Sequence, residues 1–180
     1  MVNFKKYRQK IINSLNQPNL ERDINILFNE IKFTWKSKKN FFICGNGGSA
    51  AIASHMAIDY SKNGRLPSLA FNDGAALTCL GNDLGFENVF AEQLKLHARP
   101  GDLVFAISSS GSSPNILAAV QQAQEVDCQV VTLSGFSPDN PLRKEGLLNW
   151  YVNSPEYGFV ELSHLVICHL ILDYQMGWRP

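Results

Sequence analysis

Residues 41–49, Phe-Phe-Ile-Cys-Gly-Asn-Gly-Gly-Ser, decide the fold of this chain. Four apolar residues in a row are typical of a strand that is buried on both faces of a parallel sheet. The glycine-rich turn that follows leads into residues 50–61, whose pattern predicts a helix. A strand, a tight turn and a helix form the first half of a βαβ unit, which indicates an α/β protein.

The same alternation continues towards the C-terminus. Further strands are predicted at residues 68–71, 102–107, 128–133 and 150–152. Further helices are predicted at residues 73–97, with breaks near Gly81 and Gly85, and at 114–125 and 159–176. Strands that alternate with helices favour a parallel five-stranded sheet with helices on both faces.

Two helices are expected ahead of this unit. Apolar residues recur at helical spacing from Phe4 to Leu15 and again from Leu20 to Trp35. Asn19 offers an N-cap for the second helix. We therefore divide the chain into a helical extension at residues 1–38, expected to serve oligomerisation, and an α/β domain at residues 39–180.

Composition excludes several classes of protein. Hydrophobic residues make up 45% of the 180 residues, which is enough for a core and excludes a disordered chain. Lys plus Arg and Asp plus Glu both number 16, and this balance argues against nucleic acid as a partner. The longest nearly apolar stretch, Leu162–Leu172, is too short to span a membrane. Four single cysteines in apolar surroundings predict buried free thiols and a cytoplasmic location.

Two loops could hold an anion at the carboxyl edge of the sheet, where such folds bind ligands. Gly45–Ser49 precedes one predicted helix, and Ser108–Ser113 precedes another that begins at Pro114, with Ser113 as its expected N-cap. Either loop alone is also a common tight turn, but two on one edge favour a site. Glycines allow close approach of a ligand, and hydroxyl and N–H groups bind phosphate. The candidate contacts are Asn46, Gly47, Ser49, Ser108, Ser109, Ser110 and Ser113.

Two nucleotide-binding patterns fit less well. Gly45, Gly47 and Ala50 match G-x-G-x-x-A, a dinucleotide fingerprint. The ribose-binding acid expected about 20 residues later is missing, because Asp73 lies further along. The phosphate-loop pattern G-x-x-x-x-G-K-[ST] is absent from the sequence.

Titratable side chains on two predicted helices could move protons or hold a metal. His55 and Asp59 are one turn apart and share a helix face. Glu161 and His169 lie on the last helix, about 12 Å apart along its axis, so holding one metal with both would need extended side chains or a residue from a neighbouring subunit. Two imidazoles and two carboxylates are zinc ligands by type. His164 is predicted to be a hydrogen-bonded core residue.

Together these motifs resemble the sugar isomerase (SIS) family and, within it, the phosphoheptose isomerases. The resemblance covers residues 40–176, and its motifs are Gly45–Ser49 with His55, Gly81–Asp83 with Gly85-Phe86, Gly101-Asp102, Ser108–Asn115 and the histidine-bearing last helix. It implies a flavodoxin-like sheet, the SIS fold, and a homotetramer with active sites between subunits.

The resemblance also implies roles for single residues. The phosphate of a sugar is expected on Ser108, Ser110 and Ser113, near Ser49. The expected zinc ligands are His55, Asp59, Glu161 and His169, of which Asp59 and His169 are also the expected catalytic pair. Glu161 and Asp83 are further expected contacts of the substrate, although Asp83 could instead be a loop cap.

The activity implied is aldose–ketose isomerisation of a phosphorylated sugar, most simply sedoheptulose 7-phosphate to glycero-manno-heptose 7-phosphate. Two positions depart from the family, which has glutamate where this chain has Asp59 and glutamine where it has Glu161. The shorter Asp59 retracts its carboxylate by about 1 Å, a misplacement that can cost about 100-fold in rate. A second interpretation therefore stays open, namely a non-catalytic SIS protein that binds sugar phosphates as a sensor or adaptor, including the kind that binds a replication initiator.

Overall fold

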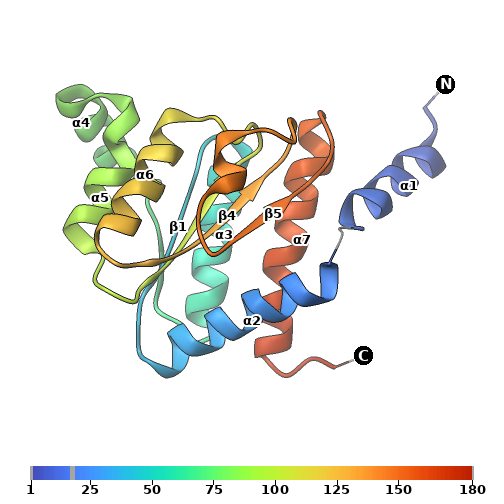
Figure 1. Cartoon of the computed structure of the whole chain (residues 1–180), viewed down its shortest axis with the longest axis horizontal. Coiled ribbons are helices and arrows are strands. Elements are labelled where there is room, and N and C mark those ends of the chain that lie inside the picture. The colour runs from blue at the N-terminus through green and yellow to red at the C-terminus, as the bar shows by residue number, and fades with distance from the viewer. Residues whose placement is uncertain (1, 17–18, 180) are drawn as a thin grey trace.

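A computed structural model describes residues 2–16 and 19–179 and shows a single parallel sheet between layers of helices (Figure 1). The strands are β1 (Phe41–Gly45), β2 (Ser68–Ala70), β3 (Leu103–Ser108), β4 (Gln129–Ser134) and β5 (Leu148–Tyr151). They pair in the order β2-β1-β3-β4-β5, and every pairing is parallel. The predicted flavodoxin-like sheet of five strands is therefore confirmed.

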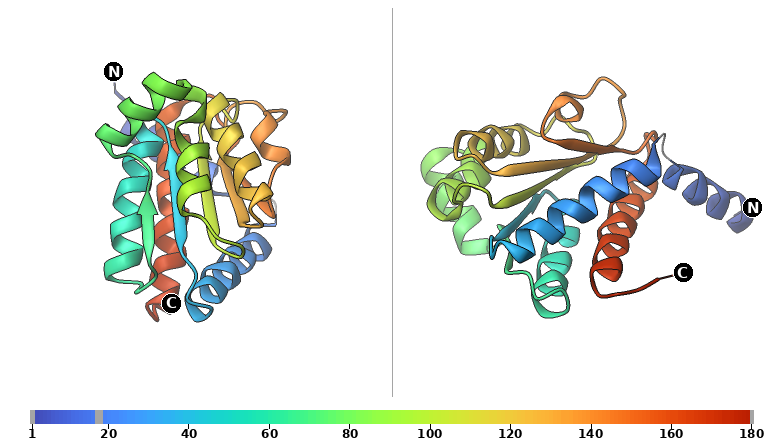
Figure 2. Two further views of the ribbon diagram at one scale, coloured as in Figure 1. Left: turned by 90° about the vertical axis from the view of Figure 1, so that its left-hand side faces the viewer. Right: turned by 60° about the horizontal axis from the view of Figure 1, so that its bottom comes forward.

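Helices cover both faces of this sheet, as predicted (Figure 2). On one face lie α2 (Leu20–Lys36), α3 (Gly48–Lys62) and α7 (Tyr157–Gln175). On the other lie α5 (Val89–His97) and α6 (Pro114–Glu125), with α4 (Gly74–Leu84) beside α5. Short 3-10 helices at Phe86–Asn88 and Pro141–Lys144 complete the connections.

Alternating side chains of the strands supply two separate cores. Phe41 and Ile43 point towards α2, α3 and α7, whereas Phe42 and Cys44 point towards α5 and α6. Every residue of β1 and β3 is buried. Burial on both faces explains why these strands read as unbroken apolar runs in the sequence.

The two N-terminal helices differ in how they pack. Leu27 and Ile31 of α2 are buried in the core that this helix shares with α3 and α7. By contrast, α1 (Phe4–Leu15) lies at the edge of the fold beside α7 (Figure 1), where Ser14 Oγ is 2.8 Å from Ser163 Oγ. Asn19 precedes α2 as expected, but its side chain forms no capping hydrogen bond.

Two sequence predictions about the region of α4 are wrong. The helix runs through Gly81 and ends at Gly85, whose φ of +86° is a conformation that favours glycine. Cys79 is exposed because α4 buries none of its residues, while Cys44, Cys128 and Cys168 are buried as predicted. Among the described helices, none is long and apolar enough to cross a membrane.

His164 on α7 is a core residue, as predicted. It is fully buried, and its Nε2 donates a hydrogen bond to the carbonyl oxygen of Ser134 at 3.2 Å. Its Nδ1 has no hydrogen-bond partner within the described part of the chain. Burial lowers the pKa of His164 to about 4, against a weaker opposing effect of the Ser134 hydrogen bond. The neutral ring is therefore the form that the fold stabilises.

This lowered pKa predicts a pH-dependent stability. The unfolded chain binds a proton at His164 below about pH 6.5, whereas the folded chain does so only near pH 4. The stability that the neutral ring contributes is complete above pH 6.5 and is lost as the pH falls towards 4. We expect the free energy of unfolding of the wild type to fall between pH 6.5 and 4.5 by about 1–3 kcal/mol more than that of His164→Gln. Urea denaturation measures this difference.

The matched control for this measurement is His97→Gln, because the His97 side chain is exposed. This variant should keep the wild-type slope. Equal slopes for the wild type and His164→Gln would contradict the prediction.

Candidate active site

A pocket of about 210 Å³ lies beyond the carboxyl ends of β1 and β3. Because these strands are parallel neighbours with Gly45 opposite Ile107, the loops that follow them reach the same edge of the sheet. The start of α7 closes the pocket. The lining residues are Asn46, Gly47, Gly48, Ser49, Ile107, Ser108, Ser109, Ser110, Ser113, Tyr157 and Glu161.

The serine loop forms a neutral cradle in this pocket. The hydroxyl of Ser108 lies 3.1 Å from that of Ser113 and 3.4 Å from that of Ser110. The Gly111 N–H donates to Ser108 Oγ, and the φ of +64° at Gly111 favours glycine. Ser113 precedes α6 as predicted, but its hydroxyl faces Ser108 instead of capping the helix. Converging hydroxyls at a helix N-terminus suit an oxyanion such as phosphate.

The glycine loop brings a carboxylate to the other side of the pocket. A β-carbon on Gly48 would lie 2.5 Å from the carboxyl carbon of Glu161, so a side chain at this position would displace the carboxylate. The Glu161 carboxylate thus lies against the first turn of α3, where the helix dipole favours negative charge. Ser49, the next residue of that turn, is buried in the pocket wall.

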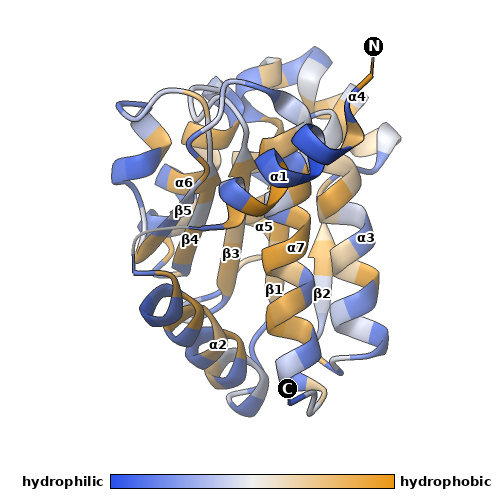
Figure 3. Ribbon diagram, turned by 90° about the vertical axis from the view of Figure 1, so that its right-hand side faces the viewer, coloured by the Kyte–Doolittle hydropathy of each residue, from blue (hydrophilic) through white to orange (hydrophobic). Residues whose placement is uncertain are grey.

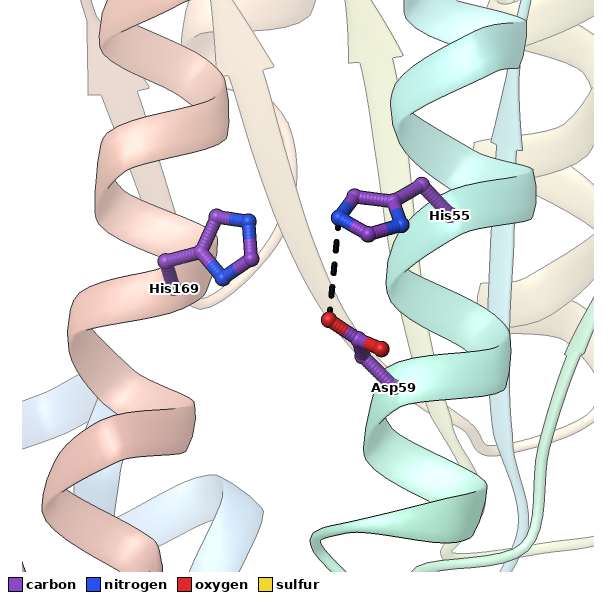
Figure 4. A group of neighbouring side chains, drawn as sticks. All are labelled: His55, Asp59 and His169. Atoms are coloured by element: carbon purple, nitrogen blue, oxygen red, sulfur yellow. Dashed lines mark ion pairs between the residues drawn. The ribbon is translucent and has the colours of Figure 1, made fainter.

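A second group of titratable side chains lies further along α3 and α7 (Figure 4). One ligand atom from each of His55, Asp59 and His169 lies within 4.8 Å of the other two. His55 Nε2 is 3.6 Å from Asp59 Oδ2, and the ring centroids of His55 and His169 are 5.3 Å apart. The His55 side chain is 50% exposed and that of Asp59 is 23% exposed, so the group is open to a ligand.

This donor set fits zinc. Two imidazoles and one carboxylate are a known set for catalytic zinc, which keeps a fourth position open. The structure does not bring the fourth predicted ligand, Glu161, into the group, because its carboxylate lines the pocket instead.

Asp83 belongs neither to the lining of the pocket nor to the His55–Asp59–His169 group. It is exposed in the last turn of α4, where its Oδ1 accepts a hydrogen bond from the Asn82 side chain at 2.7 Å. Its alternative interpretation as a loop cap is wrong, because α4 extends past it to Leu84.

The structure adds Tyr157 to the residues that line the pocket. The sequence pattern does not identify it, because it predicts that the last helix begins two residues later, at Phe159.

Asn46 and Asn115 join the two loops through a pair of side-chain hydrogen bonds. Asn46 Nδ2 donates to Asn115 Oδ1 at 2.8 Å, and Asn115 Nδ2 donates to Asn46 Oδ1 at 2.9 Å. The sequence predicts Asn46 to be a ligand contact, whereas Asn115, although part of the Ser108–Asn115 motif, has no role that the sequence predicts. A larger cleft of about 860 Å³, between the N-terminal helices and β5, is lined by none of the predicted site residues.

The chain is similar to known proteins in both sequence and structure. The SIS domain family matches residues 6–135. The phosphoheptose isomerase of Campylobacter concisus is 38% identical over 160 residues, covering 85% of this chain and 84% of that protein. That of Helicobacter hepaticus is 36% identical over 162 residues, covering 87% and 80%. The solved phosphoheptose isomerase of Neisseria gonorrhoeae superposes with a TM-score of 0.86 at 27% identity, covering 96% of each chain.

The serine cradle generates a prediction about anion binding. Ser113→Ala removes one hydroxyl from the pocket and should weaken the binding of inorganic phosphate about 10-fold or more, because hydrogen bonds to charged groups are among the stronger ones. Ser112→Ala is the matched control, because the Ser112 side chain is exposed and does not line the pocket. Isothermal titration calorimetry measures both affinities. Equal affinities for the two variants would contradict an anion site at this loop.

Proposed function

Since the chain belongs to the SIS domain family and, within it, to the phosphoheptose isomerases, we propose that its pocket and its His55–Asp59–His169 group form one active site. The reaction is aldose–ketose isomerisation, in which sedoheptulose 7-phosphate is converted into glycero-manno-heptose 7-phosphate. The observation that carries the proposal is that the first turns of α3 and α7 line the pocket beside the serine cradle, and the same two helices carry His55, Asp59 and His169 further along.

The spacing suits a phosphorylated heptose. Glu161 and His169 are eight residues apart on α7, a rise of about 12 Å. A chain of seven carbons with a phosphate ester, with bonds of about 1.5 Å, spans roughly 10 Å when extended. A phosphate on Ser108, Ser110 and Ser113 would therefore let C1 and C2 of the sugar reach His55, Asp59 and His169. Glu161 and Asn46, which line the pocket with the serine loop, would contact the sugar near its phosphate end.

The proton transfers are assigned to Asp59 and His169. Asp59 takes the proton from C1 of the ketose and later returns it to C2, so that an enediol is the intermediate. His169 donates a proton to the carbonyl oxygen at C2 and takes one from the hydroxyl at C1, so the reaction has no net gain or loss of atoms. Oδ2 of Asp59 faces His55 at 3.6 Å, and Oδ1 accepts a long hydrogen bond of 3.5 Å from Asn63 Nδ2, which a substrate would have to replace.

His55, Asp59 and His169 are the residues proposed to hold zinc, without Glu161, whose carboxylate lines the pocket instead. When bound, zinc polarises the hydroxyl–carbonyl pair of the substrate. The alternative of a non-catalytic sensor or adaptor is not favoured, because the relatives are isomerases and His55, Asp59 and His169 lie together as side chains able to transfer protons. The four free thiols support a cytoplasmic enzyme.

We further propose that the enzyme is a homotetramer that covers the open side of this site. Ile58 of α3 and Leu162 and Val166 of α7 are 59%, 40% and 43% exposed around the titratable group. In Figure 3 much of the α7 ribbon has the colour of hydrophobic residues, and this helix packs against α3. Contiguous exposed apolar side chains favour a protein–protein interface. The exposed apolar residues of α1, such as Phe4 and Ile12, support a role for residues 1–38 in the same assembly.

Assembly can be tested by light scattering coupled to size exclusion. The wild type should have about four times the 20.1 kDa mass of one chain. Val166→Glu places a charge on the proposed interface and should give smaller species, whereas the control Leu96→Glu, at an exposed position on α5, should not. A monomeric wild type would refute the tetramer.

Catalysis can be tested with sedoheptulose 7-phosphate and zinc. Asp59→Asn should lower kcat by about 100-fold or more, because a general base is lost. Asp59→Glu, which restores the family's side chain, should keep measurable activity, and Asp127→Asn, in an exposed turn, should match the wild type. Product formation gives the rate, and metal analysis after dialysis separates loss of zinc from loss of the base. No turnover by the wild type would reject the proposed function, and full activity of Asp59→Asn would reject the role of Asp59.

A further inference from the structure

The amide pair between Asn46 and Asn115 joins the two loops that form the pocket. Asn46 follows β1, and Asn115 lies in the first turn of α6, directly after the serine loop. Each amide donates to and accepts from the other, at 2.8 and 2.9 Å. Within the described residues, no other side-chain–side-chain hydrogen bond connects Gly45–Ser49 with Ser108–Asn115.

The two partners have different surroundings. Asn46 lines the pocket, whereas Asn115 does not line it and is only 2% exposed. Asn115 therefore cannot bind the sugar directly, and its amide is committed to Asn46. The fold of α6 does not depend on this amide, since Ile116, Ala119 and Val120 anchor the helix in the core.

We infer that Asn115 is a positioning residue, which holds Asn46 and the glycine loop at a fixed spacing from the serine loop. This inference rests on the proposed function, because one substrate must contact both loops. The phosphate is held on the serine side, and the sugar carbons pass the glycine side. A shift of about 1 Å between the loops would misplace the reacting carbons, and errors of that size can cost about 100-fold in rate.

The chemistry of the pair requires an amide on both sides. An amide presents a donor and an acceptor side by side, so two amides satisfy each other completely. Asn115→Asp would set a carboxylate oxygen against the Asn46 carbonyl oxygen in one of the two contacts. Asn115→Ala would leave the side chain of Asn46 without either contact. Both variants should release the glycine loop while leaving the serine hydroxyls unchanged.

The experiment compares a ligand that needs one loop with a substrate that needs both. Inorganic phosphate needs only the serine cradle, whereas sedoheptulose 7-phosphate needs both loops. For Asn115→Ala and Asn115→Asp we expect kcat/KM to fall 10- to 100-fold while the dissociation constant of inorganic phosphate stays within twofold. Asn25→Ala, which removes an exposed helical asparagine, is the matched control and should match the wild type.

A double-mutant cycle provides the second arm. If Asn115 acts only through Asn46, then Asn46→Ala combined with Asn115→Ala should be no less active than Asn46→Ala alone. Additive losses, an unchanged kcat/KM in Asn115→Ala, or a parallel loss of phosphate affinity and thermal stability would overturn the inference. The last result would mean that Asn115 merely supports α6.

The inference can fail separately from the proposed function. If the wild type does not turn over sedoheptulose 7-phosphate, calorimetry still measures its affinity for this sugar phosphate and for inorganic phosphate. The quantity to compare is the ratio of the first affinity to the second. That ratio should fall 10-fold or more in Asn115→Ala and stay constant in Asn25→Ala. A ratio that does not change in Asn115→Ala would overturn the positioning role even if the protein only binds sugar phosphates.

Discussion

The parallel register of β1 with β3 is the constraint on which the site depends. Gly45 lies opposite Ile107, so the two strands end at the same level and their loops open side by side. The register is fixed at the other end by Asp102, whose buried carboxylate accepts hydrogen bonds from the backbone N–H groups of Asn40 and Arg99, both at 2.8 Å. A shift by one residue would break these bonds and would reverse which side chains face each core.

Close packing of α3 against α7 is the second constraint. The Tyr60 hydroxyl donates to the carbonyl oxygen of Cys168 at 3.0 Å, and Gln175 Nε2 donates to that of Gly64 at 2.8 Å. Gly64 has no room for a β-carbon, because Leu172 and the backbone of Tyr60 lie against it. These contacts hold the C-terminal end of α3 against the C-terminal half of α7. They place the titratable groups of both helices opposite each other on rigid elements, which is what precise chemistry requires.

The sequence correctly predicts the strands, helices and loops whose positions depend on the local residue pattern. The apolar runs of β1 and β3 and the bounds of α6 follow from periodicity, and the loop positions follow from glycine, serine and proline. What it could not predict depends on tertiary contacts. Gly81 stays helical although glycine is a poor helix former, and Cys79 is exposed although its neighbours are apolar. The side-chain orientation of Glu161 and the partner of Asn115 are likewise set by residues distant in sequence.

The position of Glu161 explains how the pocket could orient its substrate. The N-termini of α3, α6 and α7 meet at this pocket, and a helix N-terminus favours an anion. The first already has the Glu161 carboxylate against it, so a phosphate there would meet a like charge. The second offers only neutral hydroxyls. In the proposed site, a dianionic phosphate would therefore favour α6, and the rest of the sugar would extend along α3 and α7 towards His55, Asp59 and His169.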